Sequence, residues 1–271
     1  MSQSQFLRAA AEQDPRKRGL FAMPDPPFQN ESTPGYRAAV DRTDELERLR
    51  AQAQKRKSML VFGPEGVGKT RLLRSFVKTQ PLALYVSQTH SPRELMLALM
   101  EALQGVARGG LHLPVSPPSL STSSLKGVIQ RALDLFPFLL VLDHLAGPSR
   151  IATGIIKDLN YYGRTPVFFA ARTPHMEDIG SLQPMCADRS ERLELKNLPS
   201  PIAREFAQRE AERTGLWASN LEHALHSLVE WSEGNPASIL QMLKMAHLPK
   251  YRMDDQIKAH VLHLDYIMGR R

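Results

Sequence analysis

Short apolar runs alternate with amphipathic segments from residue 37 to about residue 198. Short, mostly apolar runs are typical of strands buried in a parallel sheet. Expected strands lie at 58–62, 82–86, 138–142, 166–171 and, with alternating polarity, 192–195. Helical periodicity separates them, at 37–54, 69–78, 92–103, 122–135 and 148–162. Strands that alternate with helices predict an α/β fold with a parallel five-stranded sheet flanked by helices.

The pattern changes after residue 198, where only helical periodicity remains. Expected helices lie at 201–214, 219–232 and 236–247. They predict a small all-helical domain behind the α/β domain. The tail after it partly alternates and is compatible with a strand or a short helix. The expected divisions are 1–36 (proline-rich basic leader), 37–198 (α/β domain), 199–250 (helical domain) and 251–271 (C-terminal tail).

Composition adds little to this organisation, but it limits which binding partners and which cellular compartment we expect. The net charge of +7 and the pI of about 9.6 favour a polyanion such as DNA, although a merely solubilising charge explains them equally well. The single cysteine, Cys186, cannot form an internal disulfide, which fits a reducing compartment. Since no apolar run reaches the length of a signal peptide core or a membrane span, we expect a cytoplasmic protein without a membrane partner.

One motif carries specific chemistry, the glycine loop at residues 63–70. It has the complete pattern Gly-x4-Gly-Lys-Thr, with an apolar strand before it and an amphipathic helix after it. In such a phosphate loop, backbone N–H groups surround a phosphate, Lys69 reaches the outer phosphates, and the Thr70 hydroxyl ligates Mg²⁺. The pattern therefore predicts a P-loop NTPase that binds ATP and Mg²⁺. The expected nucleotide contacts are Gly63, Pro64, Glu65, Gly66, Val67, Gly68, Lys69, Thr70 and Arg71.

A second candidate for the cation site is an acidic residue that directly follows the most apolar run. Asp143 follows the strand at 138–142 and matches a Walker B aspartate, which holds Mg²⁺ together with Thr70. The next residue is His144, where many ATPases carry an acid that polarises the attacking water. Either the imidazole of His144 replaces that base, or no base exists there and hydrolysis is slow. We favour slow or partner-stimulated hydrolysis.

In order and spacing, these motifs resemble those of the AAA+/STAND group of P-loop ATPases. The segment 40–46 (VDRTDEL) is similar to a short motif that precedes the nucleotide fold in that group. Residues 170–173 (AART) look like the end of the sensor-1 strand, and residues 234–236 (GNP) look like the Gly-x-Pro element of a helical lid. The resemblance covers residues 37 to about 247. This sequence departs from the pattern of the group in two respects. His144 replaces the usual acid after the Walker B aspartate, and the GNP element lacks the arginine, called sensor 2, that many AAA+ proteins carry.

The resemblance implies a site between two domains. ATP would lie between the α/β domain and the helical lid, with Pro236 touching the nucleotide and Arg172 sensing the γ-phosphate. Assembling members of the group complete the site with an arginine from a neighbour. Arg189 and Arg192 occupy a plausible place for that residue, although solvated surface arginines explain them equally well.

Three functions therefore remain open. The first is an ATP-dependent switch or assembly factor that acts on a protein partner or on itself, in a DNA-associated form if the basic charge serves DNA. The second is a small-molecule kinase, which shares the P-loop but would need paired arginines around a substrate, a set that we do not find. The third is a non-hydrolysing module in which the nucleotide only stabilises the fold. We expect Lys69, Asp143, His144 and Arg172 to carry any catalysis.

Overall fold

The computed structural model describes residues 42–87, 91–106, 120–144, 149–162 and 164–269. The leader at 1–36 lies outside this range, as does the beginning of the helix expected at 37–54. Within the described ranges, no helix combines the length and the apolar character needed to cross a bilayer.

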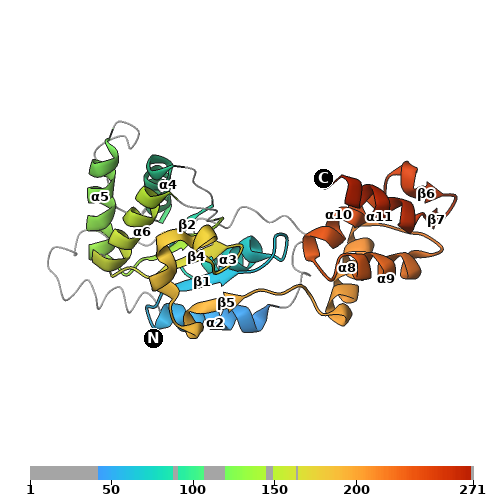
Figure 1. Ribbon diagram of the computed structural model, residues 1–271, viewed down its shortest axis with the longest axis horizontal. Coiled ribbons are helices and arrows are strands. Elements are labelled where there is room, and N and C mark those ends of the chain that lie inside the picture. Colours follow the sequence, from blue (N-terminus) through green and yellow to red (C-terminus); the bar gives the residue numbers. More distant parts are fainter. Residues whose placement is uncertain (1–41, 88–90, 107–119, 145–148, 163, 270–271) are drawn as a thin grey trace.

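A five-stranded parallel sheet forms the centre of the α/β domain, as the sequence predicts (Figure 1). Its strands are β1 (Met59–Phe62), β2 (Ala83–Val86), β3 (Leu139–Leu142), β4 (Val167–Ala171) and β5 (Arg192–Glu194). The order across the sheet is β2-β3-β4-β1-β5. Strand β4 therefore lies between the strand that leads into the glycine loop and the strand that ends at Asp143. All three strands deliver their carboxyl ends to the same edge.

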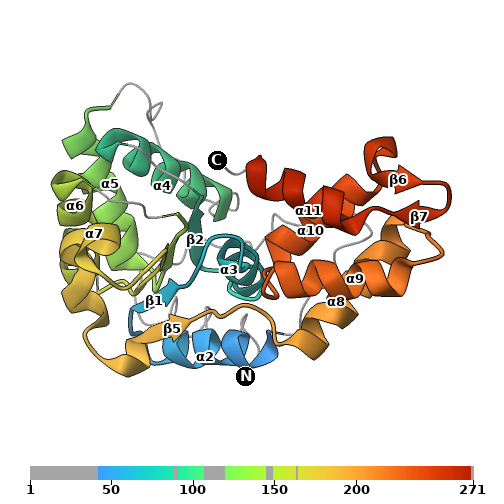
Figure 2. The ribbon, with the colours of Figure 1, turned by 45° about the vertical axis from the view of Figure 1, so that its right-hand side comes forward.

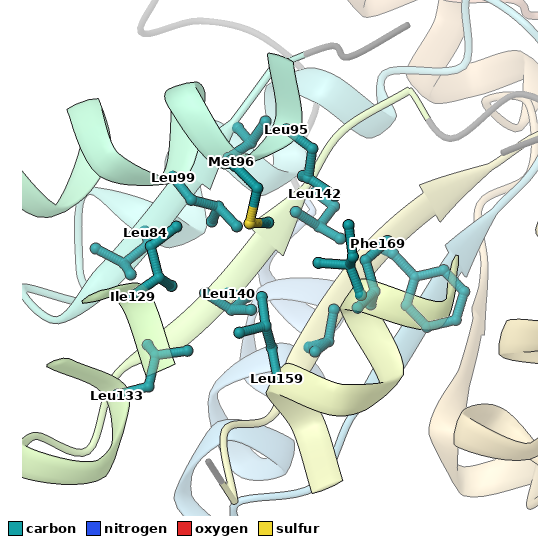
Figure 3. Close-up of a cluster of buried hydrophobic side chains, with 14 of the residues drawn as sticks. Leu84, Leu95, Met96, Leu99, Ile129, Leu133, Leu140, Leu142, Leu159 and Phe169 are labelled. Carbon is teal, nitrogen blue, oxygen red and sulfur yellow. The ribbon is translucent and has the colours of Figure 1, made fainter. Parts of the chain in front are cut away.

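Helices cover both faces of this sheet because the strands are apolar on both sides. The helices are α2 (Thr43–Gln54), α3 (Lys69–Val77), α4 (Pro92–Val106), α5 (Thr122–Leu135), α6 (Arg150–Tyr162) and the short α7 (Met176–Ile179). Leu140 and Leu142 point toward α4, α5 and α6, where Leu99 and Leu159 complete a fully buried cluster (Figure 3). The alternate strand residues, such as Val141, pack on the opposite face against α2 and α3. This double burial explains the continuous apolar runs in the sequence.

A second domain follows β5 and is built from helices around its own core. Its elements are α8 (Ser200–Thr214), α9 (Leu221–Trp231), α10 (Pro236–Ala246), η5 (Pro249–Tyr251), the strands β6 (Arg252–Met253) and β7 (Gln256–Ile257), and α11 (Ala259–Met268). The tail forms a small antiparallel hairpin and then a helix. Leu262 and Tyr266 of α11 share a core with α8, α9 and α10, and the Tyr266 hydroxyl donates to Ser238 Oγ at 2.7 Å. The helical core thus includes residues on both sides of position 250.

The two domains meet at the carboxyl edge of the sheet. Figures 1 and 2 show the helical domain to the right of α3, on the side of the α/β domain where that helix lies. The backbone N–H of Ala237, in the first turn of α10, donates to the carbonyl oxygen of Gly66 at 3.2 Å. The fold therefore places the first turn of α10 directly on the loop that the sequence assigns to phosphate.

Candidate nucleotide site

The glycine loop leads from β1 into α3 along a path that favours glycine at three positions. The φ angle is 153° at Gly63, 78° at Gly66 and 105° at Gly68, where a side chain would be strained. A Cβ atom on Gly63 would also lie 2.2 Å from the carbonyl oxygen of Leu195. Gly68 is the N-cap of α3, so the loop ends at the N-terminus of a helix. Such a terminus offers unpaired N–H groups and a positive dipole end to an anion.

The side chain of Lys69 folds back onto the glycine loop. Its Nζ donates hydrogen bonds to the carbonyl oxygens of Gly63 (2.7 Å) and Pro64 (2.9 Å). Burial lowers the pKa of Lys69, while the carboxylates of Asp143 and Glu65 act in the opposite direction. An ammonium group that is partly out of water gains more from an anion than from carbonyl oxygens. Lys69 is therefore placed to exchange these two contacts for phosphate oxygens.

The other expected loop contacts fall into two groups. Val67 is 1% exposed and packs in the core beneath the loop, so only its backbone can reach a ligand. Pro64 and Glu65 are exposed on the outside of the loop, and Arg71 lies in the first turn of α3.

Asp143 is buried at the end of β3 and is held by two hydrogen bonds. Its Oδ2 accepts from the hydroxyl of Tyr85 at 2.9 Å, and its Oδ1 accepts from the backbone N–H of His144 at 3.0 Å. The side chain is only 1% exposed. A buried carboxylate needs such donors or a cation nearby. The carboxylate is thus fixed in orientation at the edge of the sheet where the glycine loop also ends.

Tyr85 was not among the predicted site residues. It lies on β2, where it pairs in register with Val141 of β3, and its hydroxyl accepts from Nε of Arg74 at 3.2 Å. Burial, with a contribution from Asp143, raises the pKa of Tyr85 to about 12, so the hydroxyl keeps its proton at neutral pH. The sequence did contain a signal that could have indicated this residue, because Tyr85 is a single phenol in the otherwise aliphatic run from Leu82 to Val86.

The structure brings His144 to the residue that the sequence assigns to the cation, Thr70. His144 adopts a left-handed backbone conformation, with φ of 55°. Its Nε2 lies 3.0 Å from Oγ1 of Thr70 and 3.8 Å from Oδ2 of Asp143. The side chain is 56% exposed and so is open to solvent and ligands. Residues 74 positions apart thereby form one polar group beside the N-terminus of α3.

Arg172 follows β4 and therefore lies between the glycine loop and Asp143. Its carbonyl oxygen accepts from the backbone N–H of Gly63 at 3.2 Å, and its side chain is exposed. Burial is the largest effect that lowers the pKa of Lys69, and the positive charge of Arg172 adds a smaller effect in the same direction. Arg172 thus lies beside the glycine loop, where the sequence resemblance leads us to expect a γ-phosphate sensor. By contrast, Arg192 donates from Nε to the carbonyl oxygen of Cys186 at 2.7 Å.

The helical domain contacts the glycine loop through Asn235 and Ala237. Nδ2 of Asn235 donates to the carbonyl oxygen of Glu65 at 2.8 Å. Oδ1 of the same side chain caps α10 by accepting from the N–H groups of Ala237 (3.1 Å) and Ser238 (3.2 Å). The sequence assigned the lid contact to Pro236, which here occupies the first turn of α10. An Asn before a Pro at a helix start was the available signal for a capping residue.

A third contact to the loop comes from the segment that precedes the fold. The guanidinium group of Arg42 donates to the carbonyl oxygen of Lys196 at 2.8 Å and, more weakly, to that of Val67 at 3.5 Å. It also pairs with Glu45 at 2.7 Å. The described part of the motif at 40–46 thus connects α2, the end of β5 and the glycine loop.

Comparisons with known proteins agree on the fold. No protein-family model and no curated protein matches this sequence. Among solved structures, the Walker-type ATPase of Pyrococcus abyssi aligns over 87% of this chain and 75% of its own, with a TM-score of 0.60 and 18% identity. The ORC1 protein of Aeropyrum pernix, solved in complex with DNA, aligns over 86% of this chain and 66% of its own (TM-score 0.61, 16% identity).

Cdc6p from Pyrobaculum aerophilum aligns over 83% of this chain and 65% of its own, with a TM-score of 0.57 and 13% identity. At such identities the similarity concerns the fold. This chain spans about two thirds to three quarters of the length of these three structures. The protein has the AAA+ P-loop ATPase fold that the sequence resemblance implied, with its parallel sheet and flanking helices.

Proposed function

We propose that this protein binds ATP and ADP with Mg²⁺ at the carboxyl edge of its sheet. The observation that carries this proposal concerns Lys69 and Thr70, which begin α3 after three glycines with positive φ. Thr70 and Asp143 both lie near Nε2 of His144 beside this helix N-terminus. A side chain on Gly63 would collide with backbone. This set of ammonium, hydroxyl, carboxylate and backbone N–H groups fits a triphosphate with a hard divalent cation.

The roles follow from the positions. Lys69 would bind the outer phosphates, and Thr70 and Asp143 would hold Mg²⁺, which neutralises charge on the phosphate oxygens. Arg172 would face the γ-phosphate from the end of β4. Backbone N–H groups of the glycine loop would bind the inner phosphates.

Hydrolysis is slow or depends on a partner in this proposal. The residue after Asp143 is an imidazole that contacts Thr70, not a carboxylate. An imidazole near Thr70 is a weaker candidate for orienting the attacking water than an acid placed above the phosphate. A non-hydrolysing module is the closest alternative, and a kinase is less favoured because the site shows no paired arginines for a second substrate among the described residues.

The nucleotide acts as a switch because the helical domain bonds to the loop itself. The carbonyl oxygens of Glu65 and Gly66 accept from Asn235 and Ala237. Any shift of these carbonyl groups when phosphate binds changes the geometry of both hydrogen bonds. Nucleotide state is thereby coupled to the position of the helical domain, on which a partner or a second copy could act.

The direct experiment measures nucleotide affinity by titration calorimetry with ADP, and then with ATP, in the presence of Mg²⁺. We expect wild-type protein to bind both and Lys69→Ala to lose most of the affinity. Lys78→Ala is the matched control, because Lys78 is an exposed lysine at the other end of α3. Equal affinity in wild type and Lys69→Ala would refute the proposal. ATP turnover by wild type then separates the slow ATPase from the non-hydrolysing module.

A DNA-associated form of the switch is supported by the net charge of +7 and by the fold shared with the ORC1 protein that was solved with DNA. We expect duplex DNA to bind with an affinity that falls as salt rises. The test compares ATP turnover and particle size by light scattering, with and without DNA. If DNA alters neither, the partner is a protein or a second copy of this chain.

A further inference from the structure

In the proposed site, a ring nitrogen of His144 lies close to the side-chain oxygen atoms of Thr70 and Asp143, which would hold the cation. Nε2 of His144 lies 3.0 Å from Thr70 Oγ1 and 3.8 Å from Asp143 Oδ2. Thr70 comes from the first turn of α3, whereas Asp143 and His144 follow β3. Two elements far apart in sequence thus contribute three atoms that are all able to ligate a metal ion.

The spacing of these atoms fits a shared octahedral ion. Ligands about 2.1 Å from such an ion are about 3.0 Å apart when adjacent and about 4.2 Å apart when opposite. The distance from His144 to Thr70 equals the adjacent spacing, and the distance from His144 to Asp143 falls between the two limits. Both distances from His144 Nε2 therefore lie within the range that one octahedral ion can bridge.

The backbone supports this position of the imidazole. His144 has φ of 55°, and its N–H donates to Asp143 Oδ1 at 3.0 Å, so the carboxylate itself holds the turn. The other carboxylate oxygen, Oδ2, accepts from Tyr85 and has a second lone pair for a cation. The imidazole is 56% exposed, which leaves room for a cation to enter with its nucleotide.

We propose that His144 is a direct ligand of the nucleotide's divalent cation, together with Thr70 and Asp143. This inference rests on the nucleotide site proposed above. Mg²⁺ is a hard ion that takes oxygen ligands, whereas Mn²⁺ and, more strongly, Co²⁺ accept imidazole nitrogen. The site therefore prefers the Co²⁺ and Mn²⁺ complexes of the nucleotide to the Mg²⁺ complex.

The experiment uses the full chain with Mn²⁺ and ADP, so that no turnover is required. Pulsed electron paramagnetic resonance detects the coupling of a directly bound ¹⁴N nucleus to Mn²⁺. We expect this coupling in wild type and its loss in His144→Asn, a substitution that suits the left-handed backbone. His223→Asn is the matched control, because His223 is exposed on α9 away from the site, and it keeps the coupling.

A second measurement compares the affinity of the protein for Co²⁺–ADP and Mg²⁺–ADP. We expect wild type to favour the cobalt complex by about tenfold and His144→Asn to lose that preference while still binding Mg²⁺–ADP. Binding of Mn²⁺–ADP by wild type without ¹⁴N coupling, or coupling that persists in His144→Asn, overturns this inference and leaves the nucleotide site standing. Absence of ADP binding with every cation overturns both.

Discussion

The side-chain amide of Asn235 donates a 2.8 Å hydrogen bond to the backbone carbonyl oxygen of Glu65, 170 residues away in sequence. The same amide caps helix α10 through its oxygen atom. One buried side chain therefore belongs to both the start of a helical-domain helix and the glycine loop. This double role makes the contact between the domains sensitive to the conformation of the loop.

Asn235→Asp separates these two roles. The aspartate keeps an oxygen that can cap α10 but replaces the donor to Glu65 by a carboxylate that repels the carbonyl oxygen. We expect faster hydrogen exchange in residues 63–70 with little change in helix α10. Asn235→Ala, which removes both roles, should cost about 1 kcal/mol more of unfolding free energy through the lost cap. Unchanged exchange in the loop of Asn235→Asp would show that the amide does not hold the domains together.

Gly66→Ala tests the tightness of the same contact. A Cβ atom on Gly66 would lie 2.6 Å from Ala237 Cβ and 2.7 Å from Asn235 Oδ1, and φ is 78° there. We expect a loss of about 1–3 kcal/mol in unfolding free energy, together with weaker ADP binding. Denaturant titration and calorimetry measure the two effects.

Gly127→Ala provides the control for that substitution. Gly127 lies within α5, and a Cβ atom there would meet nothing within 4 Å. Alanine in a helix interior should stabilise the protein by about 0.5–1 kcal/mol. A loss of stability equal to that of Gly66→Ala would contradict the steric argument.

Tyr85→Phe probes the support of Asp143. Removing the hydroxyl deprives a buried carboxylate of one donor, and we expect a cost of about 1–2 kcal/mol in unfolding free energy at pH 7. The substitution should also weaken Mg²⁺-dependent ADP binding, because Asp143 loses one of the groups that orient it. Tyr161→Phe, at an exposed site on α6, is the matched control for the loss of a phenol hydroxyl and should leave Mg²⁺-dependent ADP binding unchanged.

The same tyrosine predicts a pH dependence. Its pKa is raised to about 12 in the folded chain, above the ordinary value of 10.0. The folded state therefore binds the phenol proton more tightly than the unfolded state does. Its contribution to stability is complete below pH 10 and is lost as pH rises toward 12. We expect wild type to lose stability more steeply than Tyr85→Phe over this window in denaturant titrations, and parallel curves would disprove the assignment.

Arg42→Ala tests the link between the segment before the fold and the glycine loop. It removes a charged donor from the carbonyl oxygens of Lys196 and Val67. We expect ADP affinity to fall by about threefold to tenfold, with Arg42→Lys intermediate because an ammonium group cannot bridge both carbonyl groups as well. Arg204→Ala, at an exposed site on α8, should leave affinity unchanged.

Local sequence patterns predicted most of the architecture. Continuous apolar runs such as that at 138–142 indicated strands buried on both faces, and all four residues from Leu139 to Leu142 are buried in the structure. The glycine loop was recognisable because its three glycines, lysine and threonine fall within eight consecutive residues, 63–70. The sequence also indicated Asp143, because it follows the most apolar strand, and Arg172, through the resemblance of residues 170–173 to a sensor-1 strand end. Their assigned roles stay predictions until nucleotide binding is measured.

Other features depend on which distant segments become neighbours. The pairing of Tyr85 with Asp143 requires β2 to lie next to β3, and the contact of His144 with Thr70 requires α3 and the end of β3 to share one edge. The contact of Asn235 with Glu65 requires two separately packed cores to dock. The sequence alone therefore determined the elements and the phosphate motif, because these arise from contiguous residues. Only the tertiary structure decided the partners of each polar side chain, because strand order and domain docking are set by packing between segments that the chain separates.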